Sequence, residues 1–229
     1  MRGLTRVSSG GVPGVPRTGV VWVPGLGLDR RSSARVRGRI GGAVVHLPGL
    51  GRRETVPPAP VLAARLAAEL PAGRVVLVGH SQSCGVVAAL AEHDPRVAGV
   101  LLLGPTPDPR TRRLRVLAGR WARTAVHEPW WQVPLLLAQW ATTGPVRMSA
   151  LWRRTSGERL DGRLRRVRVP VVVLRGSHDA LCPHDWARQL AAAAPHGRLV
   201  ELPGAAHMTP QTHPDEVAAV VADLVRQVS

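Results

Sequence analysis

Short apolar runs bounded by glycine and proline recur along the chain at a length typical of β-strands. They are almost continuously hydrophobic rather than alternating, which favours strands that are buried on both faces, as in a parallel sheet covered by helices. The six runs are GVVWVP (19–24), GGAVVHLP (41–48), RVVLVG (74–79), VAGVLLLG (97–104), VPVVVLRG (169–176) and GRLVELPG (197–204).

Segments with helical spacing of apolar residues lie between several of these runs. They cover residues 59–70, 84–94, 184–194 and 213–228. Strands that alternate with helices are typical of an α/β architecture, in which an open sheet carries helices on both faces. We therefore predict one α/β domain with an open, mostly parallel sheet.

The alternation is interrupted after the fourth run, because residues 105–168 contain no strand-like segment. Leu114, Leu117 and Trp121 share one face of a predicted helix. Pro134 and Pro145 suit the first turns of two further helices. An insertion of this kind between two strands predicts a helical cap over the carboxyl edge of the sheet.

These patterns predict three parts: a flexible tail over residues 1–18, a core formed by 19–104 together with 169–229, and the cap, 105–168. The tail is rich in Gly, Pro and Ser. Five of the seven tryptophans lie in the cap, where they could line an apolar pocket or form the cap's own core: Trp121, Trp130, Trp131, Trp140 and Trp152.

Charge narrows the classes of partner. The chain has 31 Lys and Arg residues against 15 Asp and Glu, a formal net charge of +16 at pH 7. Such an excess can mark binding to nucleic acid, an anionic membrane or an anionic substrate. Because no nucleic-acid-binding signature accompanies it, we interpret it as a solvated arginine surface. We expect neither nucleic acid nor a membrane as a partner.

Cysteine usage and the absence of targeting signals point to the interior of the cell. Cys84 and Cys182 are too few for a disulfide framework and lack zinc-site spacing, so we expect free thiols in a reducing compartment. No apolar run approaches the length of a membrane span, and no signal peptide is recognisable. We predict a cytoplasmic protein. The sequence contains no metal-ligand constellation and lacks the lysine that a P-loop or Schiff base needs, so we expect no metal and no cofactor.

The stretch VVLVGHSQSCGVVAAL, residues 75–90, joins a predicted strand to a predicted helix through a turn of small residues. Gly79 and Ser83 stand two positions before and after Ser81. This pattern is close to the Gly-x-Ser-x-Gly turn, whose strained backbone projects a serine hydroxyl. Serine replaces the second glycine, adds only a hydroxymethyl group and could turn its hydroxyl back onto the backbone. The pattern predicts Ser81 as a nucleophile.

A base and an acid for such a serine follow later strands. His207 lies in PGAAHMTP, after the last predicted strand, and Asp179 lies in LRGSHDALCP, directly after the strand before it. Because the carboxyl ends of parallel strands share one edge of the sheet, both residues are expected near Ser81. A carboxylate there would hold the histidine in the tautomer that accepts a proton. Asp108, in GPTPDPR, is the competing acid.

Nucleophile, acid and histidine occur in the chain order of the α/β-hydrolases. With these motifs, residues 19–228 resemble the α/β-hydrolase fold superfamily. VPGLG (23–27) resembles its oxyanion loop, with Pro24 in place of the usual histidine, and HLPGLGRRE (46–54) resembles another of its loops. The resemblance implies that the backbone N–H groups of Leu26 and Gln82 are the oxyanion donors.

The same resemblance implies a serine hydrolase that cleaves an ester-type bond of a small or medium organic substrate. A meta-cleavage C–C bond hydrolase is an alternative, although His80 and Met208 stand where that branch usually has Asn and Trp. A thioesterase, whose cap arginines would hold an anionic carrier, is a second alternative. A non-catalytic binding protein of the same fold is a third. The expected partner is a small-molecule substrate, and homodimerisation stays open.

Overall fold

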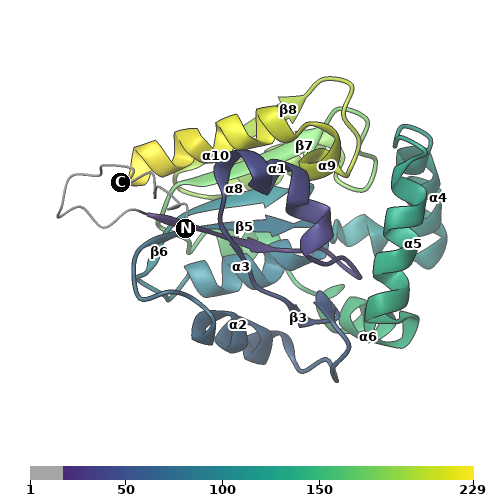
Figure 1. Ribbon diagram of the computed structural model, residues 1–229, viewed down its shortest axis with the longest axis horizontal. Helices are drawn as coiled ribbons and strands as arrows, with labels where there is room; N and C mark the ends of the chain where they lie inside the picture. Colours follow the sequence, from purple (N-terminus) through teal and green to yellow (C-terminus); the bar gives the residue numbers. More distant parts are fainter. Residues whose placement is uncertain (1–17) are drawn as a thin grey trace, which may run out of the picture.

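The structure is a computed structural model that describes residues 18–229, apart from the side chain of Leu114. The predicted tail therefore lies outside the described residues except for Thr18. Its central element is a six-stranded sheet in the order β2-β1-β5-β6-β7-β8, in which every neighbouring pair is parallel (Figure 1). The strands are β1 (Gly19–Val23), β2 (Ala43–Val44), β5 (Val75–His80), β6 (Val97–Leu103), β7 (Val171–Gly176) and β8 (Gly197–Leu202).

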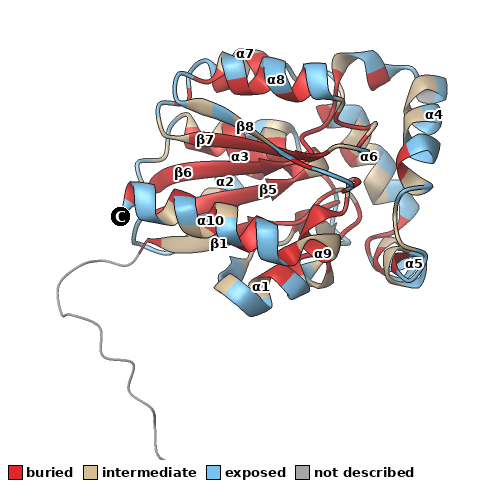
Figure 2. Ribbon diagram, turned by 90° about the horizontal axis from the view of Figure 1, so that it is seen from above, coloured by how far each residue is buried: buried red, intermediate tan, exposed pale blue. Residues whose placement is uncertain are grey.

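The continuous apolar runs form strands that are buried on both faces, as Figure 2 shows for the central strands. Successive side chains of a strand point to opposite faces. One core cluster therefore takes Leu77 and Leu102, and the other takes Val76 and Leu101. This arrangement confirms the predicted open parallel sheet.

Helices cover both faces of the sheet. The first cluster is closed by α2 (Ala59–Ala68), α3 (Cys84–Ala91) and α8 (His184–Ala193). The second is closed by α1 (Ala34–Ile40), which follows the short 3-10 helix η1 (Arg30–Ser33), and by α10 (Pro214–Val228), which follows the one-turn helix α9 (Thr209–Thr212).

The run at residues 41–48, predicted as one strand, is divided. Only β2 joins the main sheet, whereas β3 (Leu47–Pro48) pairs with β4 (Gly51–Arg52) in a separate two-stranded sheet. The chain turns back on itself, with the N–H of Leu47 donating to Leu50 O, and Gly49 and Gly51 both have positive φ. A left-handed backbone at two nearby glycines bends the chain away from a continuous strand.

Residues 105–168 contain no strand and form the 3-10 helix η3 (Pro109–Arg112) and the helices α4 (Leu114–Ala125), α5 (Gln132–Thr143), α6 (Pro145–Thr155) and α7 (Leu160–Leu164). Figure 1 shows α4, α5 and α6 standing together to one side of the sheet. Pro145 opens α6, and Pro134 lies in the first turn of α5. The two leucines that bound α7 belong to the core cluster, so core packing resumes before residue 168.

Candidate active site

Ser81 lies at the sharp turn between β5 and the short 3-10 helix η2 (Ser81–Ser83), which leads into α3. Among the described residues other than glycine, it alone has a positive φ, of 56°. A non-glycine residue in this region costs about 1–3 kcal/mol and persists only where its surroundings hold it. A Cβ at Gly79 would lie 3.2 Å from Cys84 Cα, so the strand and the helix approach as closely as the turn requires.

Ser83, which replaces the second glycine of the motif, is completely buried. Its hydroxyl accepts a hydrogen bond from the N–H of His80 at 2.9 Å and donates to Val23 O at 2.8 Å. The hydroxyl therefore connects the start of the turn to the end of the neighbouring strand β1. Serine at this position fits the turn and adds hydrogen bonds that glycine could not make.

Asp179 and His207 lie next to each other, although 28 residues separate them in the chain. The Nδ1 of His207 donates to Asp179 Oδ2 at 2.7 Å, and Asp179 Oδ1 accepts from the N–H groups of Leu181 and Cys182. Burial lowers the pKa of His207, but the Asp179 carboxylate outweighs that effect, and the net pKa is above its usual value. The contact leaves Nε2 of His207 as the nitrogen able to accept a proton.

Gly104, at the end of β6, makes room for this pair. It has a φ of +50°, and a Cβ there would lie 2.9 Å from both Asp179 Oδ2 and His207 Nδ1. Real Cβ contacts are essentially never that short. A glycine is therefore required at this position for the carboxylate and the imidazole to meet.

His80 supports the loop that carries His207. Its ring is buried, and its Nε2–H donates to the backbone O of His207 at 3.1 Å. Burial, reinforced by the neighbouring His207, lowers the pKa of His80 to about 3, so the ring is neutral at physiological pH. Among residues 18–229 its Nδ1 has no hydrogen-bond partner, which is consistent with an uncharged ring.

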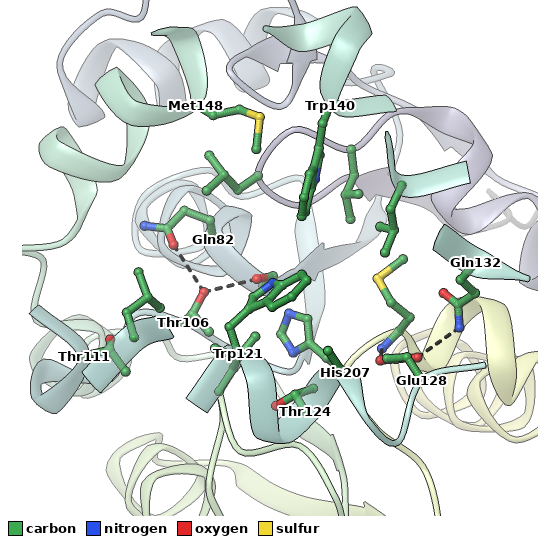
Figure 3. Close-up of a pocket in the computed structure, with 18 of the residues that line it drawn as sticks. Gln82, Thr106, Thr111, Trp121, Thr124, Glu128, Gln132, Trp140, Met148 and His207 are labelled. Atoms are coloured by element: carbon green, nitrogen blue, oxygen red, sulfur yellow. Dashed lines mark hydrogen bonds between the residues drawn. The ribbon is translucent and has the colours of Figure 1, made fainter. Parts of the chain in front are cut away.

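The hydroxyl of Ser81 contacts Thr106 rather than His207. The Oγ of Ser81 lies 3.2 Å from Thr106 Oγ1, which donates to Gln82 Oε1 (Figure 3). The Gln82 amide donates in turn to Thr155 in α6. Between the described residues Ser81 and His207 there is no hydrogen bond. This chain of polar groups connects Ser81 to the helical segment, and the sequence offered no signal for it.

The two predicted oxyanion donors lie beside Ser81. Gln82 is in the first turn of η2, where backbone N–H groups lack a partner within the helix. On either side of Leu26, the loop is held by hydrogen bonds from Gly27 to Gly49 O and from Leu28 to Gly25 O. Leu26, Ser81 and Gln82 all line the same cavity.

Asp108, the competing acid, has different partners. Its buried carboxylate forms ion pairs with Arg110 and Arg120. Burial raises the pKa of Asp108, but the hydrogen bonds from both arginines outweigh it and the net pKa is lowered. The structure thus places Asp179, and not Asp108, against His207.

A cavity of about 610 Å³ lies above Ser81, between the sheet edge and helices α4, α5 and α6. Its walls are mainly apolar, and Figure 3 shows Trp121, Trp140 and Met148 projecting toward it. Trp152 is the third tryptophan in the lining. The five tryptophans of residues 105–168 therefore divide between the cavity and the surface, with Trp130 82% exposed.

In a comparison with protein families, the sequence model of the alpha/beta hydrolase family matches residues 13–220 of the chain. The chain belongs to the alpha/beta hydrolase family. This confirms the resemblance drawn from the sequence motifs and agrees with the parallel sheet.

Several solved structures share this alpha/beta hydrolase fold at low sequence identity. A hydrolase from Oleispira antarctica is 13% identical with a TM-score of 0.77, covering 93% of this chain and 92% of the other. An enol-lactonase from Burkholderia xenovorans is 19% identical with a TM-score of 0.72 and 94% coverage of both chains. A thermophilic esterase from Thermogutta terrifontis is 22% identical with a TM-score of 0.66, covering 92% and 90%.

Glu128 is a cavity residue of this alpha/beta hydrolase that the sequence analysis missed. It follows α4, and its carboxylate accepts from the N–H of Met208 at 2.7 Å and from the Gln132 side chain at 2.9 Å (Figure 3). Burial raises the pKa of Glu128, and the N–H of Met208 partly opposes the shift. A carboxylate from the helical segment thus holds the loop that carries His207.

Other groups relevant to ligand binding are few. Within residues 18–229, no three His, Cys, Asp or Glu side chains gather closely enough to hold a metal ion. Cys84 and Cys182 are buried and free, and burial raises the pKa of both thiols. In the same residues, no helix is long and apolar enough to cross a membrane.

Proposed function

We propose that this protein is a serine hydrolase that cleaves an ester bond of an uncharged, apolar substrate. The observation that carries the proposal is the position of Ser81, whose backbone is held at positive φ beneath a cavity that also exposes His207. The hydrogen bond from His207 to Asp179 supports the role of His207 as the general base. The esterase and enol-lactonase neighbours are consistent with this class of chemistry.

In the proposed reaction, the Ser81 hydroxyl leaves Thr106 by rotation about its side-chain bond and attacks the ester carbonyl carbon. His207 Nε2 takes the hydroxyl proton, and the imidazolium that forms is stabilised by Asp179. The N–H groups of Leu26 and Gln82 would hold the oxygen on which negative charge develops. Collapse of the tetrahedral intermediate returns the proton from His207 to the departing alcohol and leaves an acyl group on Ser81.

Hydrolysis of the acyl group repeats these steps with water. His207 removes a proton from the water as its oxygen attacks the acyl carbon, and then returns a proton to Ser81 as the carboxylic acid departs. The residues named so far are sufficient for both halves of the reaction.

The lining of the cavity supports an apolar ester over the two other substrate classes considered. Its charged or titratable members are Glu128 and His207, and none of the described lining residues is an arginine. A dienoate, or an anionic part of a carrier that entered this cavity, would bring a negative charge next to Glu128 without an arginine to pair with it, which is unfavourable. The cavity volume of about 610 Å³ accommodates a medium-sized organic molecule.

Covalent labelling with a fluorophosphonate probe tests the proposal directly. We expect the full chain to be labelled and Ser81→Ala to lose both the label and, by about 10³-fold or more, the hydrolysis of p-nitrophenyl esters. Ser149→Ala, which changes an exposed serine of α6, is the matched control and should keep both. A chain that is folded but neither labelled nor active would support a non-catalytic binding protein instead.

A further inference from the structure

One face of α5 is apolar and lies in solvent. Val133 and Leu137 lie four residues apart on one face of α5, and Trp130 precedes the helix in the turn that leads into it. Val133, Leu137 and Trp130 are 52%, 57% and 82% exposed. The helix itself, QVPLLLAQWATT, contains no charged residue. An exposed apolar face of this kind on a folded domain marks a contact surface.

The outward face of α4, in the same helical segment, adds positive charge. At about 100° per residue, Arg115, Arg123 and Val126 fall within one narrow arc of the helix, on the side away from Leu117, which lines the cavity. Both arginines are exposed, and neither forms an ion pair with any described residue. Val126 at the end of the helix is 78% exposed. Figure 2 shows α4 and α5 at the outer edge of the molecule.

The charge of the whole helical segment is strongly unbalanced. Residues 105–168 contain fourteen arginines and only four acidic residues. Each acidic residue is already engaged: Asp108, Glu158 and Asp161 form ion pairs with arginines, and Glu128 holds the backbone of Met208. The outer surface of the segment therefore keeps an excess of positive charge that its own carboxylates do not neutralise.

The apolar face is continuous with the opening of the cavity. Trp121 and Val133 both line the cavity, and they are nevertheless 43% and 52% exposed. They therefore stand at its rim, where the surface of α5 and the interior of the cavity meet. A molecule that covers the apolar face also covers the entrance.

We propose that the outer surface of α4, of α5 and of the turn between them, defined by Arg115, Arg123, Val126, Trp130 and Leu137, binds an anionic phospholipid surface. Exposed tryptophan and aliphatic side chains insert at the level of the lipid headgroups, and nearby arginines are attracted to anionic headgroups. The binding is peripheral. It departs from the expectation, drawn from the sequence, that a membrane is not a partner.

Two other occupants fit the surface less well. Nucleic acid would pair with the arginines but would leave the exposed Val126 and Leu137 without an apolar partner. A second copy of the chain would bring the same arginines face to face across a twofold axis, and like charges in such a contact repel. A lipid surface alone satisfies both the positive charge and the apolar side chains.

The consequence for the active site rests on the proposed function. An apolar ester partitions into lipid, and an entrance held at the lipid surface would receive it without passage through water. Lipid binding is measured by co-sedimentation with Ser81→Ala, which keeps the proposed lipid-binding surface but lacks the proposed nucleophile, so its failure and the failure of the proposed ester cleavage can be told apart.

Co-sedimentation with vesicles tests the proposal. The full chain should bind vesicles of phosphatidylcholine and phosphatidylserine at least tenfold more tightly than vesicles of phosphatidylcholine alone. The double variant Trp130→Ser and Leu137→Ser should lose this binding while keeping its activity on a water-soluble ester, because neither residue lines the cavity. Equal binding to both kinds of vesicle, or binding to neither, would overturn the proposal.

Matched charge variants distinguish a specific surface from general attraction. Replacing both Arg115 and Arg123 by glutamine should weaken binding to the anionic vesicles by about fivefold per arginine. The control, Arg74→Gln with Arg188→Gln, removes two exposed arginines of the core and should have little effect. An equal loss in the control would refute the assignment to α4 and α5. A dimer that Trp130→Ser dissociates, with no vesicle binding, would assign the surface to a second copy.

Discussion

Ser83→Ala tests whether the hydroxyl at the second glycine position holds the turn together. The alanine removes the acceptor for the N–H of His80 and the donor for Val23 O. Ser83 is fully buried and His80 is 4% exposed, so water cannot replace the lost partner. A buried backbone group without a partner costs about 1–3 kcal/mol. For a chain of this length, lowering the free energy of unfolding by about 2 kcal/mol, the middle of that range, lowers Tm by about 4–8 °C.

Scanning calorimetry of three variants separates the hydroxyl from the size of the side chain. Ser83→Gly restores the usual motif but loses the same hydrogen bonds, so its Tm should fall at least as far as that of Ser83→Ala. The control is Ser33→Ala. The buried Ser33 hydroxyl has no hydrogen-bond partner in the described part of the chain, so its removal should leave Tm unchanged or raise it. A Ser83→Gly variant as stable as the original chain would refute the reasoning.

Three further outcomes concern the proposed chemistry. The net pKa of His207 lies above its usual value of 6.5, so kcat/KM should fall as pH drops through a midpoint above 6.5. Because the Glu128 carboxylate contributes to the raised pKa, Glu128→Gln should move the midpoint of the pH–rate profile to lower pH. Asp179→Asn should lower kcat by about 10⁴-fold, whereas Asp108→Asn should mainly lower Tm. Equal losses of kcat in the two variants would contradict the assignment of Asp179 as the acid that orients His207. Gly104→Ala should fold yet lose activity, because the added Cβ displaces the carboxylate or the imidazole, and full activity would show that the pair can shift without penalty.

The arrangement of the sheet could be predicted because its strands are buried on both faces and therefore appear as unbroken apolar runs. The same logic placed Ser81, Asp179 and His207 near one another, since each follows a strand whose carboxyl end lies at one edge. The division of residues 41–48 could not be predicted from apolar periodicity, because it depends on glycine dihedral angles.

The polar contacts around the cavity could not be predicted for a different reason. Thr106 and Glu128 lie in segments without strong periodicity, and their partners are distant in the chain. The sequence also could not show which tryptophans line the cavity. Trp130 and Trp140 belong to the same apolar segment, and only the packing of the helices places one at the surface and the other in the cavity wall. Contacts of this kind follow from tertiary packing rather than local pattern.

The distribution of tryptophans gives the molecule a built-in optical signal. The chain has no tyrosine and no phenylalanine, so its near-ultraviolet emission comes from seven indoles alone. Trp121, Trp140 and Trp152 border the cavity, while Trp22 and Trp186 are buried in the core and act as an internal reference. A guest molecule in the cavity would change the emission of the first group and leave that of the second unaltered, so occupancy can be followed without a dye or a chromogenic substrate.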